Sequence, residues 1–407
     1  MQSQNTYLSK FMKISLVILH LILFCSRVFG ATSVGSVVPG LKQSCVTHKS
    51  SVVYLLEVDP DQRTIALEHA TAPGCSREPV SSIVERMHAA AGLNSNNYRR
   101  GGTFNGNAVD FLKICDVIYA DPGIHRTALC WCKTNQTPLI GTLNTELNFI
   151  IGSKKYIIDR INQPRQDSEL VLYTPAFGHF TRTRQTGIEL IIEHDQVTKV
   201  ASGGHSPIPT NGMVLSIGRD SSFFMLVDKN LENLPVICQS RIILQTGKHE
   251  YDVSDFDYIT SGAGLLVANG TIVENLEFDF IHDKSVTHCA DEAAADFAQE
   301  KERTWLIYQQ HPRTAVGILQ DGSWLFVVVD GRQPGYSNGM SLPELAKFMP
   351  DHGCVYALNL GGGGCSTLVV NNIIMNSPAG TTIHGQLLSQ KDKLDNERPV
   401  DAAFVIY

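Results

Sequence analysis

The chain contains the stretch Trp324-Leu325-Phe326-Val327-Val328-Val329-Asp330-Gly331-Arg332. Six apolar residues in a row, rich in aromatic and β-branched side chains, are typical of a strand that is buried on both faces. The run ends abruptly in a carboxylate and a guanidinium, and the rim of a sheet is where functional sites are commonly assembled. The stretch therefore predicts a buried strand that delivers Asp330 and Arg332 to a site.

A second apolar run, Tyr356-Ala357-Leu358-Asn359-Leu360, ends in a similar way. The residues that follow it are Gly361, Gly362, Gly363, Gly364, Cys365, Ser366 and Thr367. Consecutive glycines lose much conformational entropy on folding, so they indicate a close approach of the backbone to a ligand or unusual backbone angles. Their N–H groups can form an anion-binding nest, and a tight bulge without a ligand is the alternative. The loop lacks the Gly-Lys-Ser/Thr ending of a nucleotide P-loop, which argues against a nucleotide ligand.

Strand-like runs outnumber helix signals along the rest of the chain. The runs lie at residues 52–58, 64–67, 189–192, 213–216, 241–244 and 265–267. Helices are predicted from two capping boxes, Ser82 with Glu85 and Ser341 with Glu344, and from the Ala- and Glu-rich residues 291–303. The predicted fold class is therefore α+β, with large, mostly antiparallel sheets and a few packing helices.

The N-terminus has the pattern of a secretory signal peptide. Lysines precede an apolar run over residues 14–24, and Val28-Phe29-Gly30 suits cleavage before Ala31. A retained N-terminal anchor is the alternative. Cleavage predicts export to an extracellular, periplasmic or lumenal compartment, with no integral membrane span left in the mature chain. We expect three parts: a signal peptide over residues 1–30, a strand-rich lead-in over 31–80 and one domain over 81–407.

Composition excludes several classes of protein. Of the 407 residues, 43% are hydrophobic and 18% are charged, which is typical of a globular chain and not of a disordered one. The formal net charge is −7 and the sequence has no run of Lys and Arg, so we expect no nucleic-acid partner. The cysteines match no zinc-binding spacing, so no metal is predicted.

The glycine loop and the residues before it carry a family resemblance. Residues 359–367 resemble the signature Asn-Leu-Asp-Gly-Gly-Gly-Ser-(Ser/Ala)-Thr of the phosphodiester glycosidases. The Arg-Thr-Ala-x-Gly of that family is matched at residues 313–317, and its Asp-Gly-Arg at 330–332, in the same order. Further family landmarks are matched at residues 101–105, 172–178, 208–216, 261–267 and 397–400. The resemblance extends over residues 80–407 and implies the fold and the binding region of that family.

The resemblance also implies an activity. It points to hydrolysis of a sugar 1-phosphodiester, of the type that links N-acetylglucosamine to phosphate, without a cofactor. The implied partner is a carbohydrate phosphodiester or a glycan. The implied substrate-binding residues are Asn359, Gly361, Gly362, Gly363, Gly364, Cys365, Ser366 and Thr367.

Three further residues are expected to carry the chemistry. Cleavage expels a phosphate that is already a weak base, so positive charge matters more than protonation of the leaving group. Arg313 and Arg332 can hold phosphate oxygens through their forked donors, supported by the backbone N–H groups of Gly362 to Gly364. Asp330 can act as the base for water or hold a sugar hydroxyl. The structural alternatives are an ion pair between Asp330 and Arg332, or a turn that Asp330 caps.

Arg100 stands where the family landmark at residues 101–105 is preceded by Asn, and two departures within the signature matter more. Gly361 stands where the signature has Asp, and Cys365 stands where it has the first Ser. Glycine cannot hold a hydroxyl, assist a water molecule or bind a cation, so hydrolysis is expected to be slow or absent while binding is retained. On this argument the substitution Gly361→Asp is expected to raise turnover.

Two other functions remain open. One is a non-catalytic carbohydrate-binding or phosphoglycan-binding protein derived from such an enzyme. The other is a thiol-dependent hydrolase, in which Cys365 is the nucleophile and the base is one of His205, His311, His352 and His384. A buried, packed side chain is the structural reading of Cys365.

Overall fold

The computed structural model describes residues 38–71, 74–227, 229–276, 304–380 and 389–407. The predicted signal peptide at residues 1–30 and the predicted helix at residues 291–303 lie outside these ranges. Within them, no helix is long and apolar enough to cross a membrane.

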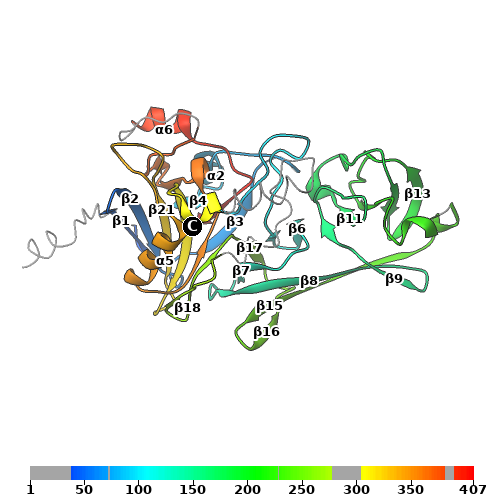
Figure 1. Ribbon diagram of the computed structural model, residues 1–407, viewed down its shortest axis with the longest axis horizontal. Coiled ribbons are helices and arrows are strands. Elements are labelled where there is room, and N and C mark those ends of the chain that lie inside the picture. The colour runs from blue at the N-terminus through cyan, green and yellow to red at the C-terminus, as the bar shows by residue number, and fades with distance from the viewer. Residues whose placement is uncertain (1–37, 72–73, 228, 277–303, 381–388) are drawn as a thin grey trace, which may run out of the picture.

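The central element is a seven-stranded antiparallel sheet, on the left of Figure 1. Its strands, in spatial order, are β1 (Leu41–His48), β2 (Ser51–Val58), β21 (Trp324–Val329), β20 (Arg313–Leu319), β22 (Cys354–Asn359), β18 (Leu265–Ala268) and β19 (Thr271–Ile272). The strand predicted at residues 324–329 is confirmed. Because β20 lies between β21 and β22 and is antiparallel to both, it begins at the edge where they end. The loops that follow the two apolar runs therefore meet at one edge of the sheet.

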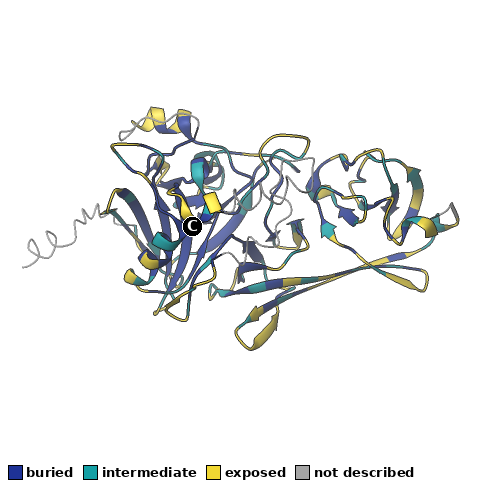
Figure 2. Cartoon of the chain, viewed as in Figure 1, coloured by how far each residue is buried: buried dark blue, intermediate teal, exposed yellow. Residues whose placement is uncertain are grey.

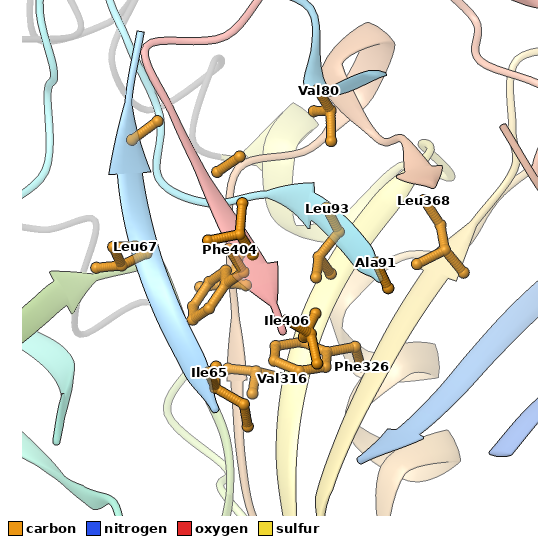
Figure 3. Close-up of a cluster of buried hydrophobic side chains, with 14 of the residues drawn as sticks. Ile65, Leu67, Val80, Ala91, Leu93, Val316, Phe326, Leu368, Phe404 and Ile406 are labelled. Carbon is orange, nitrogen blue, oxygen red and sulfur yellow. The ribbon is translucent and has the colours of Figure 1, made fainter. Parts of the chain in front are cut away.

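A second sheet packs on one face of the central sheet. Its strands, in spatial order, are β24 (Ile373–Ile374), β23 (Leu368–Val370), β4 (Ala91–Asn94), β25 (Ala402–Ile406) and β3 (Ile65–His69). Val316 and Phe326 of the central sheet share a buried cluster with Leu67, Leu93 and Phe404 of the second sheet, as Figure 3 shows. Alternate residues of each strand point into this cluster, since successive side chains of a strand point to opposite faces.

Helix α5 (Leu342–Asp351) covers the other face of the central sheet. Its residues Leu345 and Phe348 share a buried cluster with Leu325 and Val327 of β21. Strand β21 is thus buried on both faces, which explains why its sequence is an unbroken apolar run rather than an alternating one.

The two predicted capping boxes have different outcomes. The box that begins α5 is confirmed: Ser341 Oγ accepts the N–H of Glu344, and Glu344 Oε2 accepts the N–H of Ser341 at 3.0 Å. The other is wrong, because helix α2 (Val80–Arg86) begins directly after Pro79, and its first-turn Ser81 N–H donates to Glu397 Oε1 at 3.0 Å. Ser82 Oγ donates instead to Glu78 Oε1 at 2.7 Å.

Two further sheets occupy the middle of the chain. One consists of β16 (His249–Asp252), β15 (Val236–Thr246), β8 (Leu139–Ile151), β7 (Arg126–Trp131), β17 (Tyr258–Ser261), β5 (Leu112–Ile114) and β6 (Val117–Ala120), with β9 (Lys154–Ile157) paired to β8. The other consists of β10 (Arg160–Ile161), β11 (Leu170–Tyr173), β14 (Gly212–Ile217), β12 (Ile188–Glu193) and β13 (Gln196–Ser202). In Figure 1, β8 and β15 form a long ribbon that leads to the part containing β11 and β13. Figure 2 shows many exposed residues along this ribbon.

The predicted fold class, α+β with large and mostly antiparallel sheets, is confirmed. Strands pair antiparallel in all four sheets of the described residues, with the parallel pair β10 and β11 as an exception. The helices that accompany them include α2, α5 and α6 (Gln390–Asn396). Within the predicted lead-in at residues 31–80, β1 and β2 join the central sheet and β3 joins the second sheet.

Candidate active site

A cavity of about 390 Å³ lies at the edge of the central sheet where β21 and β22 end. Its lining contains Arg99, Arg100, Arg126, Arg313, Arg332 and Arg398. No Asp or Glu of the described residues lines it. Guanidinium groups bind phosphate and carboxylate oxygens through forked donors, so this lining suits an anionic ligand.

The arginines reach the cavity from strand ends that are far apart in the sequence. Arg126 is the first residue of β7 and Arg313 is the first residue of β20. Arg332 follows β21, and Arg398 precedes β25. The fold therefore gathers positive charge that forms no run along the sequence, in a chain whose net charge is negative.

Arg313 is buried and held by backbone carbonyl groups. Its Nε donates to Met340 O at 2.8 Å, and its Nη2 donates to Leu306 O at 2.6 Å and Gln309 O at 3.1 Å. Burial and then the positive charge of Arg332 lower the pKa of Arg313 to about 9, which keeps it charged at neutral pH. Because much of its hydrogen-bonding capacity is used by carbonyl groups, Arg313 acts on a ligand mainly through its charge.

Arg332 and His311 form a hydrogen-bonded pair on the cavity wall. Arg332 Nε and Nη2 lie 3.3 and 3.2 Å from His311 Nδ1, and the guanidinium lies 5.4 Å from the centre of the Trp305 ring. His311 Nε2 lies 3.1 Å from Trp305 O, which can only accept, so we assign the imidazole proton to Nε2. Burial and the charges of Arg313 and Arg332 lower the pKa of His311 to about 4. The imidazole is therefore neutral at pH 7.

Gly361 and Gly362 are in close contact with other parts of the backbone. The N–H of Gly361 donates to Ser95 O at 2.8 Å, and a Cβ atom on Gly361 would overlap Asn96 O. A Cβ atom on Gly362 would lie 3.0 Å from Pro312 O. Position 361 thus has no room for the acidic side chain of the family signature.

Gly363 and Gly364 make room for guanidinium groups. Gly363 has a φ of +71°, and a Cβ atom there would lie 3.4 Å from Arg332 Nη1. A Cβ atom on Gly364 would overlap the guanidinium of Arg398. The N–H of Gly363 donates to Pro312 O at 2.8 Å, so this predicted phosphate donor already has an acceptor in the protein. The loop therefore allows two arginines to approach, and the predicted nest of N–H groups is incomplete.

Asp330 lies outside the lining of the cavity. It is 1% exposed, and its carboxylate accepts hydrogen bonds from Asn376 Nδ2 at 2.9 Å, Ser377 N–H at 2.8 Å and Tyr336 OH at 2.9 Å. Burial raises the pKa of Asp330 to about 6. The three hydrogen bonds favour the ionised form and lower the pKa, but burial has the larger effect. The alternative considered for Asp330, an ion pair with Arg332, is not among the ion pairs of the described residues. Asp330 thus fixes the loop after β21, and this position gives it no access to a ligand in the cavity.

Replacing Asp330 with Asn should reduce stability and leave ligand affinity nearly unchanged. The carboxylate accepts hydrogen bonds on both oxygens, whereas an amide has one acceptor oxygen, so at least one buried donor loses its partner, at a cost of about 1 to 3 kcal/mol. Urea unfolding measures this loss, and Tyr336→Phe, which removes a single donor, is the matched control. A variant of normal stability that had lost turnover would instead place Asp330 in the reaction.

The predicted substrate-binding residues divide into two groups. Those that line the cavity are Asn359, Gly361, Gly362, Gly363 and Cys365, and those that do not are Gly364, Ser366 and Thr367. Asn359 Nδ2 donates to Ala263 O at 2.8 Å, while its buried Oδ1 has no hydrogen-bond partner among the described residues. Buried acceptors without partners are rare, so Asn359 Oδ1 is a candidate acceptor for a ligand hydroxyl.

Cys365 is buried, and its thiol is free. Its Sγ lies 3.5 Å from the hydroxyl oxygen of Tyr98. No described histidine is hydrogen-bonded to it, so the geometry favours a packed cysteine over an activated nucleophile. Of the histidines considered as its base, the lining includes His311 but not His205 or His352, and His384 lies outside the described residues.

Several arginines of the cavity are not predicted as site residues from the sequence. Arg398 lies in the matched landmark at residues 397–400, and Arg100 immediately precedes the one at 101–105, so the landmarks were the available signal. No sequence signal marks Arg126, which begins an ordinary strand and forms an ion pair with Asp110 in the structure.

Comparison with known families and proteins gives a consistent result. The sequence profile of the phosphodiester glycosidase family matches residues 186–407. The N-acetylglucosamine-1-phosphodiester alpha-N-acetylglucosaminidase of Mus musculus is 29% identical over 127 residues, which are 31% of this chain and 22% of that protein. The protein of the same name from Homo sapiens is 29% identical over 124 residues, which are 30% of this chain and 21% of that protein. The matches thus span about a fifth of the length of these relatives.

Solved structures with a similar fold cover most of the chain. A protein from Synechocystis has a TM-score of 0.67 at 16% identity, covering 90% of this chain and 61% of that one. A protein from Burkholderia pseudomallei, described as exported, has a TM-score of 0.67 at 19% identity, covering 90% of this chain and 74% of that one. At these identities the likeness concerns the fold alone.

Proposed function

Since this chain belongs to the phosphodiester glycosidase family, we propose that its cavity binds a sugar 1-phosphodiester and hydrolyses it slowly. The observation that carries the proposal is the cavity lining, which contains arginines from several strand ends and no Asp or Glu of the described residues. Such a lining matches a phosphodiester, which is an anion, better than a neutral glycoside. The family relationship favours a sugar of the N-acetylglucosamine type.

In the proposed complex, the phosphate lies beside the glycine loop. Arg332 and Arg398 pack against the adjacent residues Gly363 and Gly364, so both guanidinium groups are near the same part of the loop. Asn359 Oδ1 is free to accept a sugar hydroxyl. Trp305, which is 46% exposed and lines the cavity, offers an aromatic face to the sugar ring.

Hydrolysis breaks the bond between C1 of the sugar and the bridging oxygen of the phosphate. The bonding electrons remain on that oxygen, so the phosphate gains a second negative charge while the sugar acquires oxocarbenium character. Water then adds to C1 and releases a proton to the solvent. The arginines stabilise the charge that develops on the phosphate, and this replaces protonation of the leaving group.

Assistance to the attacking water is weak in this cavity. Gly361 has no side chain, and His311, with a pKa of about 4, is a poor base whose Nδ1 faces Arg332. A positioned general base typically contributes about 10²- to 10⁴-fold to a rate. We therefore expect turnover below that of a family member with an intact signature by a factor of this order.

A non-catalytic phosphoglycan-binding protein is the second candidate. It is favoured by one observation: the backbone of Asn96 occupies the space that a side chain at position 361 would need. Export is part of either proposal and is supported by the N-terminal sequence pattern, which N-terminal sequencing of the secreted chain can test.

Phosphorus NMR of the purified protein with an aryl phosphodiester of N-acetylglucosamine separates these functions. We expect the diester signal to be replaced slowly by that of the aryl phosphate, at an equal rate in Cys365→Ser. Binding without any conversion would select the non-catalytic protein. Conversion that is lost in Cys365→Ser would select the thiol mechanism, and the absence of both binding and conversion would contradict the proposal.

A further inference from the structure

The cavity lining contains more arginines than the described Asp and Glu residues pair with. Arg126 is paired with Asp110, both of them buried. The lining arginines that form no ion pair with an Asp or Glu of the described residues are Arg100, Arg313, Arg332 and Arg398. Arg313 is buried and Arg332 and Arg398 are half-buried, so without an acidic partner these three retain a desolvation cost that a bound anion offsets, whereas Arg100 is exposed and adds charge alone.

The four charges also act on one another. Burial and then Arg332 lower the pKa of Arg313. Burial, then Arg398 and then Arg100, lower the pKa of Arg332. Arg332 and Arg398 also pack against the adjacent residues Gly363 and Gly364, so their guanidinium groups lie close enough to repel. Each unit of negative charge that enters the cavity relieves several such repulsions at once.

The titratable neutral groups of the lining supply no compensating charge. His311 remains uncharged, since its pKa is lowered to about 4. Burial and then the neighbouring Cys365 raise the pKa of Tyr98, so this phenol keeps its proton at neutral pH. Within the described part of the lining, the negative charge that balances the arginines therefore has to come from the ligand.

We propose that the cavity binds the dianionic phosphomonoester released by hydrolysis more tightly than the monoanionic phosphodiester that enters. This inference rests on the proposed function, whose reaction converts one anion into the other. A phosphodiester brings one negative charge to Arg100, Arg313, Arg332 and Arg398. A phosphomonoester, with a second pKa of about 6, brings close to two above neutral pH.

Two consequences follow for the reaction. A cavity that prefers the dianion also stabilises the transition state, in which the second charge is already developing on the phosphate. The same preference retains the product, so the free phosphomonoester inhibits turnover. A reaction that removes phosphomonoesters, such as that of a phosphatase, is therefore the class of step that would sustain hydrolysis.

Titration calorimetry with methyl phosphate and dimethyl phosphate tests the preference on the whole protein. At about pH 8 methyl phosphate is a dianion, and at about pH 5 it is a monoanion, whereas dimethyl phosphate has one charge throughout. We expect methyl phosphate to bind about tenfold more tightly than dimethyl phosphate at the higher pH, and the two affinities to converge at the lower pH. Arg313 stays charged and His311 stays neutral over this range, whereas Asp330, which lies outside the lining, has a pKa of about 6 and titrates within it. Dimethyl phosphate keeps its charge, so any change in its affinity reports the protein, and the change in the affinity ratio reports the ligand.

Variants identify the charges responsible. Arg332→Gln and Arg398→Gln should each reduce the affinity ratio at pH 8, while Arg241→Gln should not, since Arg241 is exposed on β15 and paired with Asp252. Equal affinities of the unaltered protein for the two phosphates at pH 8 would overturn the preference and leave the proposed function intact. Failure to bind either phosphate would contradict the proposed function itself. The affinities of the unaltered protein for methyl phosphate and dimethyl phosphate test the preference even where a variant does not fold.

Discussion

Gly361→Asp is expected to destabilise the protein and to leave hydrolysis no faster than in the unaltered chain. A Cβ atom at this position overlaps Asn96 O, and the backbone of Gly361 is held by Ser95 O and by Asn94 Nδ2. Neither segment can move away without breaking buried hydrogen bonds. Overpacking and the burial of a carboxylate together should lower the free energy of unfolding by about 3 kcal/mol or more. The structure thus reverses the expectation, drawn from the family signature, that Asp would restore turnover.

Urea unfolding and phosphorus NMR on the same variant check both parts of this result. Gly362→Ala is the matched control, because its Cβ atom would lie 3.0 Å from Pro312 O, a milder conflict that should cost less. An Asp variant of normal stability that hydrolyses the diester faster than the unaltered chain would show that position 361 accepts the acid, and would contradict the account of a closed loop.

Arg332→Ala is expected to weaken binding of a sugar 1-phosphodiester by about 1.5 to 3 kcal/mol, the range for a lost hydrogen bond to a charged group. Arg332 is held over Trp305 and hydrogen-bonded to a neutral His311, so its charge is not cancelled by an acidic neighbour among the described residues. Calorimetry with a non-hydrolysable phosphonate analogue measures the loss without interference from turnover.

Arg241→Ala serves as the control for this loss, because Arg241 is an exposed arginine whose removal changes the net charge by the same amount. Its affinity for the analogue should equal that of the unaltered protein. An Arg332→Ala variant that is folded and binds with unchanged affinity would place the phosphate elsewhere.

Much of the fold was predictable because its central strands lie between two cores. Strand β21 is apolar at every position since α5 covers one face and the second sheet covers the other. The start of α2 was not predictable from the capping pattern, because Ser82 is drawn to Glu78, whose carboxylate also accepts from Thr71 and Arg86. The capping pattern failed here because Glu78, a competing hydrogen-bond partner of Ser82, lies outside the four residues of that pattern.

The site was harder to predict, because tertiary contacts decide which polar residues face the ligand. Asp330 looks like a base for water or a sugar-hydroxyl anchor in the sequence, yet its partners Asn376 and Ser377 come from a later segment that encloses it. Arg126 reaches the cavity from the start of a strand that no sequence motif marks, and Arg398, although part of a matched landmark, joins it only in the folded chain. The sequence therefore indicated the edge of the sheet, whereas the set of charged groups at that edge required the structure.

A crystal structure of the protein with a non-hydrolysable phosphonate analogue of a sugar 1-phosphodiester would show whether the arginine-lined cavity is the binding site. We expect the phosphorus atom inside the cavity beside the glycine loop, with Arg332 and Arg398 donating to its oxygens and Asn359 facing the sugar. An analogue bound away from these arginines, or a cavity that stays empty at saturating ligand, would contradict this expectation.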